Sequence, residues 1–452
     1  MIGVPCAPRA PGKEPVLEIR ESHLYWTISL LLVAAIVAGL AVQGTRDALA
    51  GVIAIQAHPA RLLNDFTAVG GDGAALINAA IVALIGLALV ALLRIRLSGP
   101  TIAAVFTMFG FGLFGKTPLN VIPIMIGVGI SALIARKSLQ EYILMALFGT
   151  ALGPLATALA VETGLPVLPA LALAAGGGFV VGILLPPLAI SMLRLHQGFS
   201  LYNIGLTSGF IALFAASLMV ASPAGFDSAA VVNQAPGLVL QLIAPLVSLV
   251  LILVAIIAGP RKATGDFLRL LELSGRLPSD FLTLVSPGAA LLNAGLMGLV
   301  TWGYVIVVGG PLNGPVLGGI FTAIGFATFG KHPRNSIPVM AGAVIAIVLF
   351  GLDPAAPGPL LAVLFVLTIA PLAGEFGWGV GLIAGFLHLV LVQRTGAWHL
   401  GVNLYNNGFA GGLTATLIVA VIEWYRSTRP DRWRTGSADD VRAPGAKRSG
   451  RE

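Results

Sequence analysis

Three basic residues lie inside apolar segments of this chain: Lys116, Lys331 and Arg334. A charged side chain at membrane depth costs at least about 2.5 kcal/mol by insertion scales unless it is paired or hydrated, so such a residue usually marks a function. A cation held between the ends of two short helices would recognise an anionic solute with the help of the helix dipoles. The structural alternative is that the lysines bond loop carbonyl groups or extend to lipid headgroups.

Both lysines belong to a motif that occurs twice. Phe-Gly-Lys-x-Pro-x-Asn occupies residues 114–120 and again residues 329–335. The prolines break the helices, and the asparagines either serve the freed backbone groups or coordinate a solute. Non-helical backbone at membrane depth is tolerated only inside protein or beside water, so the motif should line a cavity or pack against the other copy. The predicted substrate-binding residues are Lys116, Pro118, Asn120, Lys331, Pro333, Arg334 and Asn335.

A second motif, His-x-Gly-x-x-Leu-Tyr-Asn-x-Gly, occupies residues 196–205 and 399–408. Histidines at the membrane edge could gate a pathway or carry protons near neutral pH. The alternative, weighed equally, is a tyrosine of the interface belt, an asparagine cap and a glycine for close helix packing. The candidates for gating or proton-linked roles are His196, Tyr202, Asn203, His399, Tyr405 and Asn406.

Matched acidic residues also occur in both halves of the chain. Asp65 and Asp280 each precede an apolar segment, where an aspartate is expected to cap a helix, with ion coupling as the alternative role. Glu162 and Glu375 lie in short connections and are weaker candidates.

These residues must be positioned by membrane helices. The chain has 452 residues, 57% of them hydrophobic and only 10% charged, and this apolar content exceeds what one soluble core can bury. Apolar runs of about 20 residues, the length of one membrane crossing, include residues 24–43 and 74–93. The predicted fold is therefore all-α, a polytopic helical membrane protein.

The chain contains two copies of one unit. Residues 65–133 align with residues 280–348 without a gap, and the two copies of the histidine motif align at a shorter interval, which indicates a deletion in the second copy. Internal repeats of this size are typical of channels and carriers.

The orientation of the copies depends on two apolar arms in each motif region. Residues 101–114 and 121–135 are both short for a full crossing. If they form a re-entrant hairpin, each copy crosses the membrane five times otherwise and the second copy is inverted. A single kinked helix would give six crossings and parallel copies. The hairpin model puts most of the 26 Lys and Arg residues in the cytoplasm, so the positive-inside rule favours inverted repeats.

The predicted organisation has four parts and one location. Residues 1–23 form a cytoplasmic tail, residues 24–225 the first repeat, residues 226–425 the second repeat with a cytoplasmic linker at 260–279 that contains an interfacial helix, and residues 426–452 a basic cytoplasmic tail. We expect a multi-pass protein of the bacterial inner membrane with both termini in the cytoplasm. The lipid bilayer and a small-molecule solute are its expected partners. Nucleic acid is not expected, and a homo-oligomer is left open.

The motifs Phe-Gly-Lys-x-Pro-x-Asn and Leu-Tyr-Asn-x-Gly give the chain its resemblance to a known group. It resembles a family of multi-pass bacterial membrane proteins that is catalogued only as a domain of unknown function. The resemblance implies a bacterial membrane location and a duplicated body, and it brings no substrate. At the level of architecture the inverted halves also look loosely like urea channels.

The favoured function is a secondary carrier or channel for a small anionic solute, bound near the midplane between the two hairpin tips by Lys116 and Lys331. The alternatives are a membrane-embedded enzyme or lipid-binding scaffold that uses the same cavity, and a channel for a small neutral polar solute. Common motifs of phosphate-loop, zinc and serine enzymes are absent from the sequence. The single cysteine, Cys6, excludes disulfides and thiolate metal sites, so no metal or cofactor is expected.

Overall fold

The computed structural model describes residues 19–222 and 230–428. The predictions for the tail up to residue 18, for Cys6 and for the basic tail beyond residue 428 lie outside these ranges. Within them the chain forms helices and short 3-10 segments and no strand, which confirms the predicted all-α class.

Ten helical segments of the described chain are long and apolar enough to cross a membrane, five before residue 223 and five after residue 229. The first five are α1 (Glu21–Gln43), α4 (Asp72–Leu92), α7 to α8 (Leu139–Val161), α9 (Val167–His196) and α10 (Asn203–Ala221). The second five are α11 (Leu238–Ala258), α14 (Pro287–Val308), α17 to α18 (Pro357–Phe376), α19 (Trp378–Trp398) and α20 (Asn406–Thr428). The chain is therefore a multi-pass membrane protein with a duplicated body.

One span of each copy is broken at its centre. In the first copy, α7 (Leu139–Gly149) and α8 (Gly153–Val161) flank the 3-10 segment η1 (Thr150–Leu152). In the second copy, α17 (Pro357–Phe365) and α18 (Ala370–Phe376) flank η2 (Val366–Ile369). A proline in the first turn of α8 and of α18 removes a backbone donor, which favours a break at this point.

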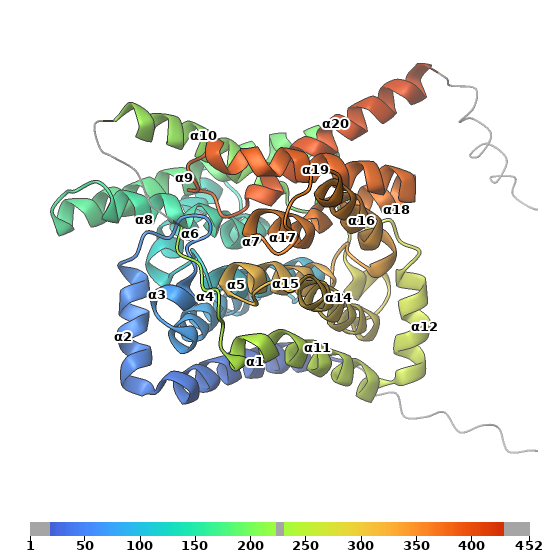
Figure 1. Cartoon of the computed structure of the whole chain (residues 1–452), viewed down its shortest axis with the longest axis horizontal. Helices are drawn as coiled ribbons and strands as arrows, with labels where there is room; N and C mark the ends of the chain where they lie inside the picture. The colour runs from blue at the N-terminus through green and yellow to red at the C-terminus, as the bar shows by residue number, and fades with distance from the viewer. Residues whose placement is uncertain (1–18, 223–229, 429–452) are drawn as a thin grey trace, which may run out of the picture.

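The remaining elements recur in the same order. The helix α2 (Thr45–Gln56) matches α12 (Pro260–Leu270), and α3 (Phe66–Val69) matches α13 (Phe281–Leu284). Figure 1 shows α2 and α12 at opposite ends of the molecule, each running across the direction of α1 and α11. The helix expected in the linker is present as α12, and it is the counterpart of α2 rather than a connector alone.

Each copy also has a hairpin of two shorter apolar helices. These are α5 (Gly99–Gly112) and α6 (Pro118–Ile134) in the first copy, and α15 (Gly314–Phe326) and α16 (Pro333–Leu349) in the second. At about 1.5 Å per residue, α5 and α15 are roughly 20 Å long, less than the hydrocarbon thickness of about 30 Å. The Gln140 side-chain amide, in the first turn of α7 that follows α6, donates at 2.8 Å to the carbonyl of Leu93, which ends α4 before α5 begins. Both arms of the first hairpin therefore end on the same side of the molecule.

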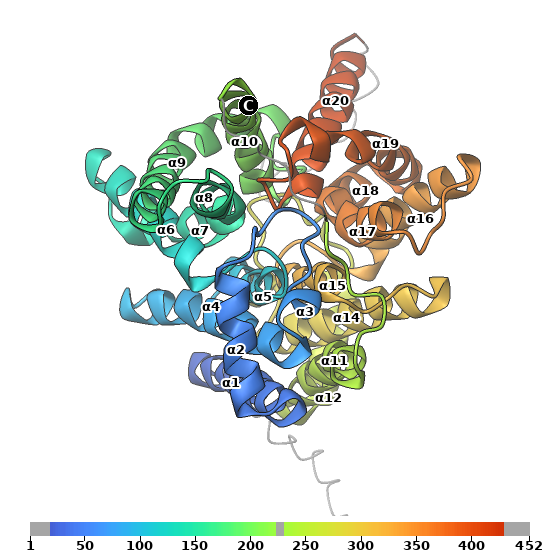
Figure 2. The same ribbon diagram turned by 60° about the vertical axis from the view of Figure 1, so that its left-hand side comes forward.

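The helices α5 and α15 pack side by side in opposite directions at the centre, with α6 to α9 on one side and α16 to α19 on the other (Figure 2). A Cβ atom on Gly325 would lie 3.0 Å from the Ala103 Cα atom, and one on Gly110 would lie 2.9 Å from the Gly318 carbonyl oxygen. Small residues thus let the two backbones approach closely, as is common between membrane helices.

Asp65 and Asp280 tie the copies together at the two ends of this pair. Each caps its own short helix, α3 or α13, which confirms the predicted capping role. The Asp65 carboxylate also accepts from the Gly314 N–H at 3.2 Å, and the Asp280 carboxylate accepts from the Gly99 N–H at 3.0 Å. Each aspartate therefore supplies a negative charge to the amino terminus of the central helix of the other copy, where the helix dipole favours it.

Asp65→Ala is expected to lower the free energy of unfolding by about 2 kcal/mol or more, because four buried donors lose their acceptor. These donors are the Thr67 N–H and hydroxyl and the N–H groups of Asn233 and Gly314. The measurement is the thermal unfolding midpoint of purified protein in detergent. Asp47→Ala, at an exposed position in the first turn of α2, is the control. Equal midpoints for the two variants would contradict the role of Asp65.

Candidate functional site

The hairpin tips are held by their own asparagines and by one from the neighbouring span. Gly115 has a φ of 96°, a left-handed conformation that favours glycine. The Asn120 amide donates to the Gly115 carbonyl at 2.9 Å, and the Asn78 amide of α4 donates to the Lys116 carbonyl at 2.8 Å. The second copy repeats these bonds with Asn335 to Gly330 at 2.9 Å and Asn293 to Lys331 at 2.6 Å. The tips are therefore fixed turns that aim each lysine side chain in one direction.

Each lysine is fully buried and reaches a tyrosine of the other copy. The Lys116 amine lies 2.8 Å from the Tyr405 hydroxyl oxygen, and the Lys331 amine is bonded to the Tyr202 hydroxyl. Among the described residues neither amine has a carboxylate within ion-pair distance. A protonated amine has only donors, so each tyrosine oxygen accepts and its own proton stays available.

Aromatic rings complete the surroundings of the lysines. The Lys116 amine lies 4.9 Å from the ring centroid of Tyr405 and 5.5 Å from that of Phe111. The Lys331 amine lies 4.4 Å from the Tyr202 centroid and 4.8 Å from the Phe326 centroid. These are cation–π distances, which offset part of the cost of burying a positive charge.

The tyrosines are positioned by the broken spans. Tyr202 precedes α10, and its N–H donates to the Thr368 hydroxyl of η2 at 3.2 Å. In the second copy, the N–H of Leu404 donates to the Ala151 carbonyl of η1 at 3.0 Å. The helices that follow the two tyrosines, α10 and α20, meet where Gly205 and Gly408 pack against each other. Both tyrosines therefore enter the centre of the molecule next to one another.

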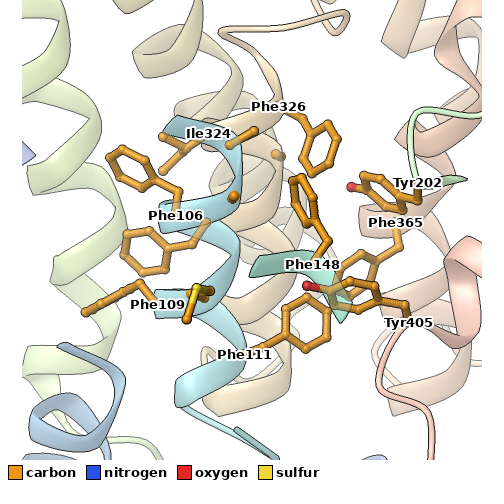
Figure 3. Close-up of a cluster of buried hydrophobic side chains, with 14 of the residues drawn as sticks. Phe106, Phe109, Phe111, Phe148, Tyr202, Ile324, Phe326, Phe365 and Tyr405 are labelled. Carbon is orange, nitrogen blue, oxygen red and sulfur yellow. The ribbon is translucent and has the colours of Figure 1, made fainter. Parts of the chain in front are cut away.

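Six rings form two related groups at this centre. Phe111 contacts Tyr405 and Phe365 with ring centroids 4.7 Å and 5.6 Å apart. Phe326 contacts Tyr202 and Phe148 at 4.6 Å and 5.5 Å. In Figure 3 the two tyrosine rings enter the cluster from the same side, and their hydroxyl oxygens point toward the phenylalanine rings. Each group combines residues of both copies.

All six rings line one cavity of about 790 Å³, within the range of small-molecule sites. We refer to it as the aromatic cavity. Thr107 of α5 and Thr322 of α15 also line it. The Thr107 hydroxyl is buried and has no hydrogen-bond partner, whereas the Thr322 hydroxyl donates to the Gly318 carbonyl at 2.7 Å. The wall is thus largely apolar, with a few hydroxyl groups.

The polar residues that line the aromatic cavity near the surface lie toward one end of the molecule. They are Arg194, Gln197, Ser279 and Asp280, next to the linker, and we refer to this end as the mouth. None of residues 58–65 or 399–403, which form the matching region of the other copy, lines it.

The face opposite the mouth is closed by an ion pair. The Arg61 guanidinium donates to both Glu162 carboxylate oxygens and, at 2.7 Å, to the Leu400 carbonyl. Only 7% of the Arg61 side chain and 6% of the Glu162 side chain are exposed. This bidentate contact is of the stronger kind.

Arg276, the counterpart of Arg61, is exposed and has no ion-pair partner among the described residues, and Glu375 of α18 is exposed as well. The Arg276 guanidinium still donates to the Gln197 carbonyl at 2.9 Å, which corresponds to the Leu400 contact of Arg61. The two matched arginines therefore differ in burial and in whether they have an ionic partner.

The other predicted site residues lie around the aromatic cavity rather than in its wall. Among the predicted residues, Tyr202, Asn203 and Tyr405 line it. Pro118 and Pro333 are the first residues of α6 and α16, and Arg334 is exposed.

The two histidines and the asparagines of their motif form matched pairs. His196 bonds Asn203 at 3.0 Å, and His399 bonds Asn406 at 3.1 Å. Asn203 and Asn406 in turn donate to the carbonyl groups of Ala189 in α9 and Val392 in α19. These contacts link the last two spans of each copy.

The lysines lie at opposite ends of the antiparallel α5 and α15 pair, because the end of each helix meets the start of the other. The hairpin tips pass each other and do not meet. A site directly between the two tips, as the sequence suggested, has no counterpart in this geometry. Instead, each lysine contacts a tyrosine, and both tyrosines line the same cavity.

Sequence reasoning missed the phenylalanine rings, Thr107 and the arginine pair. Phe111 and Phe326 stand within the repeated hairpin motif, and Arg61 and Arg276 stand at matched positions just before Asp65 and Asp280. The occurrence of these residues at matched positions in both copies was the signal that the sequence offered. Phe148 and Phe365 lie outside the ungapped repeat, so only the packed structure pairs them.

Fold and site together define a helical multi-pass membrane protein made of two copies of one unit, with a cavity between the copies. The chain belongs to the family described as protein of unknown function (DUF1576), whose model matches residues 45–221 and 260–424. The predicted resemblance is thereby confirmed, and the two matched regions agree with two repeats. No curated protein and no solved structure matches the chain.

Tyr405→Phe is expected to lower the free energy of unfolding by about 1–3 kcal/mol, because it leaves a buried amine without its acceptor. Adding Lys116→Met should recover most of that loss, since the unpaired charge disappears. The measurement is a double-mutant cycle of thermal unfolding midpoints in detergent, repeated for Tyr202→Phe and Lys331→Met. Tyr304→Phe is the control, because the buried Tyr304 hydroxyl has no partner. Additive effects would show that the amine and the hydroxyl are not coupled.

Proposed function

We propose that this protein is a secondary carrier that moves a small solute through the aromatic cavity by opening it to one side of the membrane at a time. The observation that carries the proposal is the asymmetry of the two matched arginines. Arg61 is buried in an ion pair with Glu162 at one end of the molecule, while Arg276 is exposed at the end where Arg194, Gln197 and Asp280 line the aromatic cavity. Inverted repeats that exchange conformations are a recurrent basis of alternating access.

In this proposal the opposite state forms by exchange between the copies. The region around Arg276 closes, the pair of Arg61 and Glu162 separates, and the aromatic cavity opens to the other side. The central helices α5 and α15 stay fixed by their capping aspartates. A channel would need both faces open together, so a largely buried ion pair at one face favours a carrier over a channel.

We further propose the orientation in the membrane. The hairpins of α5 with α6 and of α15 with α16 are re-entrant, because α5 and α15 are too short to cross and the first hairpin has both ends on one side. Five crossings per copy then invert the second copy, and the positive-inside rule puts both termini and α12 in the cytoplasm of a bacterial inner membrane. The aromatic cavity opens to the cytoplasm in this state.

A cysteine in the aromatic cavity tests the carrier. Thr322→Cys, in a background with Cys6→Ser, should react with a membrane-impermeant maleimide in inside-out vesicles and hardly in spheroplasts. Adding Glu162→Gln should raise the labelling in spheroplasts at least severalfold, because the closed face loses its ion pair. Asp47→Asn is the control, since this exposed aspartate lies in the first turn of α2, whereas Arg61 follows the last turn of that helix.

Each other function predicts a different labelling pattern. A channel gives labelling from both sides before any gate mutation. An enzyme or lipid-binding scaffold with a fixed cavity gives labelling from one side in both variants, and either result would overturn the carrier. Proteoliposomes extend the test, since a carrier moves a labelled solute across a sealed bilayer and an enzyme changes its structure.

The orientation has its own test in two single cysteines at exposed positions of the matched helices α2 and α12. With Cys6 replaced by serine, Arg46→Cys should be labelled from outside intact cells by an impermeant maleimide, and Gly265→Cys should be labelled only after the membrane is opened. Labelling of position 265 from outside would rule out the inverted arrangement.

A further inference from the structure

We propose that the aromatic cavity binds an organic carboxylate with an apolar body, and that the hydroxyl groups of Tyr202, Tyr405 and Thr107 hold the carboxylate. This inference rests on the proposed function only in taking the aromatic cavity as the solute site. It names a substrate class from the chemistry of the wall, and it differs from direct recognition by the lysines.

The charge behind the wall selects an anion. Lys116 and Lys331 are both fully buried, and the described residues place no carboxylate beside either amine. Each amine donates to a tyrosine oxygen, so each hydroxyl proton is free to donate into the aromatic cavity. A lysine next to the hydroxyl oxygen also makes that hydroxyl a stronger donor, because hydrogen bonds in a chain polarise one another.

A third donor is also free. Thr107 is 2% exposed, lines the aromatic cavity from α5, and has a hydroxyl with no partner among the described residues. Buried polar groups are nearly always hydrogen-bonded, so this hydroxyl requires a ligand atom or water. Its counterpart, Thr322, already donates to the Gly318 carbonyl and has no proton to give. The donors are therefore unequal on the two sides of the aromatic cavity.

The remaining wall selects an apolar body. Phe111, Phe148, Phe326 and Phe365 line the aromatic cavity together with the two tyrosine rings. Aromatic walls of this kind pack against hydrocarbon or aromatic groups. An inorganic anion such as chloride or phosphate would leave this apolar surface unfilled and would itself need more donors than three hydroxyls.

Aromatic cages in other proteins often bind quaternary ammonium groups, and this reading fails here for a specific reason. The two lysine amines already lie over the rings of Tyr405, Phe111, Tyr202 and Phe326. A cationic ligand would compete with these amines for the rings and be repelled by them. The mouth carries one residue of each sign, Arg194 and Asp280, so it does not change the preference.

Binding to purified protein in lipid nanodiscs tests the class of ligand without requiring transport. The probes are acetate, benzoate and 2-naphthoate, the amides of the two aromatic acids, and benzyltrimethylammonium. We expect benzoate or naphthoate to raise the thermal unfolding midpoint and to bind in calorimetry. The matching amide should bind at least tenfold more weakly. Acetate, which lacks the apolar body, should bind weakly as well.

Thr107→Val is the decisive variant because the hydroxyl that it removes has no partner in the protein, so folding should be unchanged. It should weaken binding of the aromatic carboxylate about tenfold, the usual effect of one hydrogen bond to a charged group. Thr322→Val, in the same wall, is the matched control and should bind the carboxylate as the unmodified protein does.

Three results would overturn the inference: no carboxylate stabilises the protein, the amide or the ammonium compound binds as tightly as the acid, or Thr107→Val binds the acid normally. The proposed carrier function is tested separately. Carboxylate binding without alternating cysteine labelling would refute the carrier and keep the ligand class. Alternating labelling with no preference for carboxylates would keep the carrier and refute the ligand class.

Discussion

The architecture depends on the burial of two lysine amines that have no acidic partner beside them within residues 19–222 and 230–428. A buried ammonium group must find acceptors and ring faces or it destabilises the fold by several kcal/mol. Here the acceptor for each lysine comes from the other copy, Tyr405 for Lys116 and Tyr202 for Lys331. This requirement fixes how far each hairpin enters the molecule, and it forces the two copies to interlock. The glycine contacts between α5 and α15 and the aspartate caps at their ends make that interlocking possible.

The two copies share an arginine that is in a different environment at each end of the molecule. Arg61 is buried and paired with Glu162, while its counterpart Arg276 is exposed. Both arginines keep a bond to the carbonyl of the facing loop, at Leu400 and at Gln197. The arginines are thus anchored in the same way, and the acidic partner is the part that differs.

The sequence predicted the helical class, the duplication, the short arms of the hairpins and the capping aspartates, because these features follow from local patterns of apolar residues, glycine and proline. It also identified Lys116 and Lys331 as costly residues. It did not predict their partners, since a contact between Lys331 and Tyr202 depends on how two distant segments cross. The aromatic rings were missed for a related reason: Phe148 or Phe365 in an apolar span is indistinguishable from ordinary core until a cavity is seen beside it. The sequence also could not show that the two hairpin tips pass each other, because an alignment of the repeats does not say how far each hairpin enters the molecule.

The exchange of partners between copies has a consequence for the history of such a chain. One copy alone would carry a buried lysine with no tyrosine to meet it and half an aromatic cavity. With the inverted orientation proposed above, it could complete the arrangement only by pairing with a second molecule that entered the membrane the other way up. A single-copy ancestor would therefore have inserted in both orientations and assembled as an antiparallel dimer. Fusion of its two orientations into one chain would then have allowed the copies to diverge, as Thr117 and His332 have done beside the retained lysines.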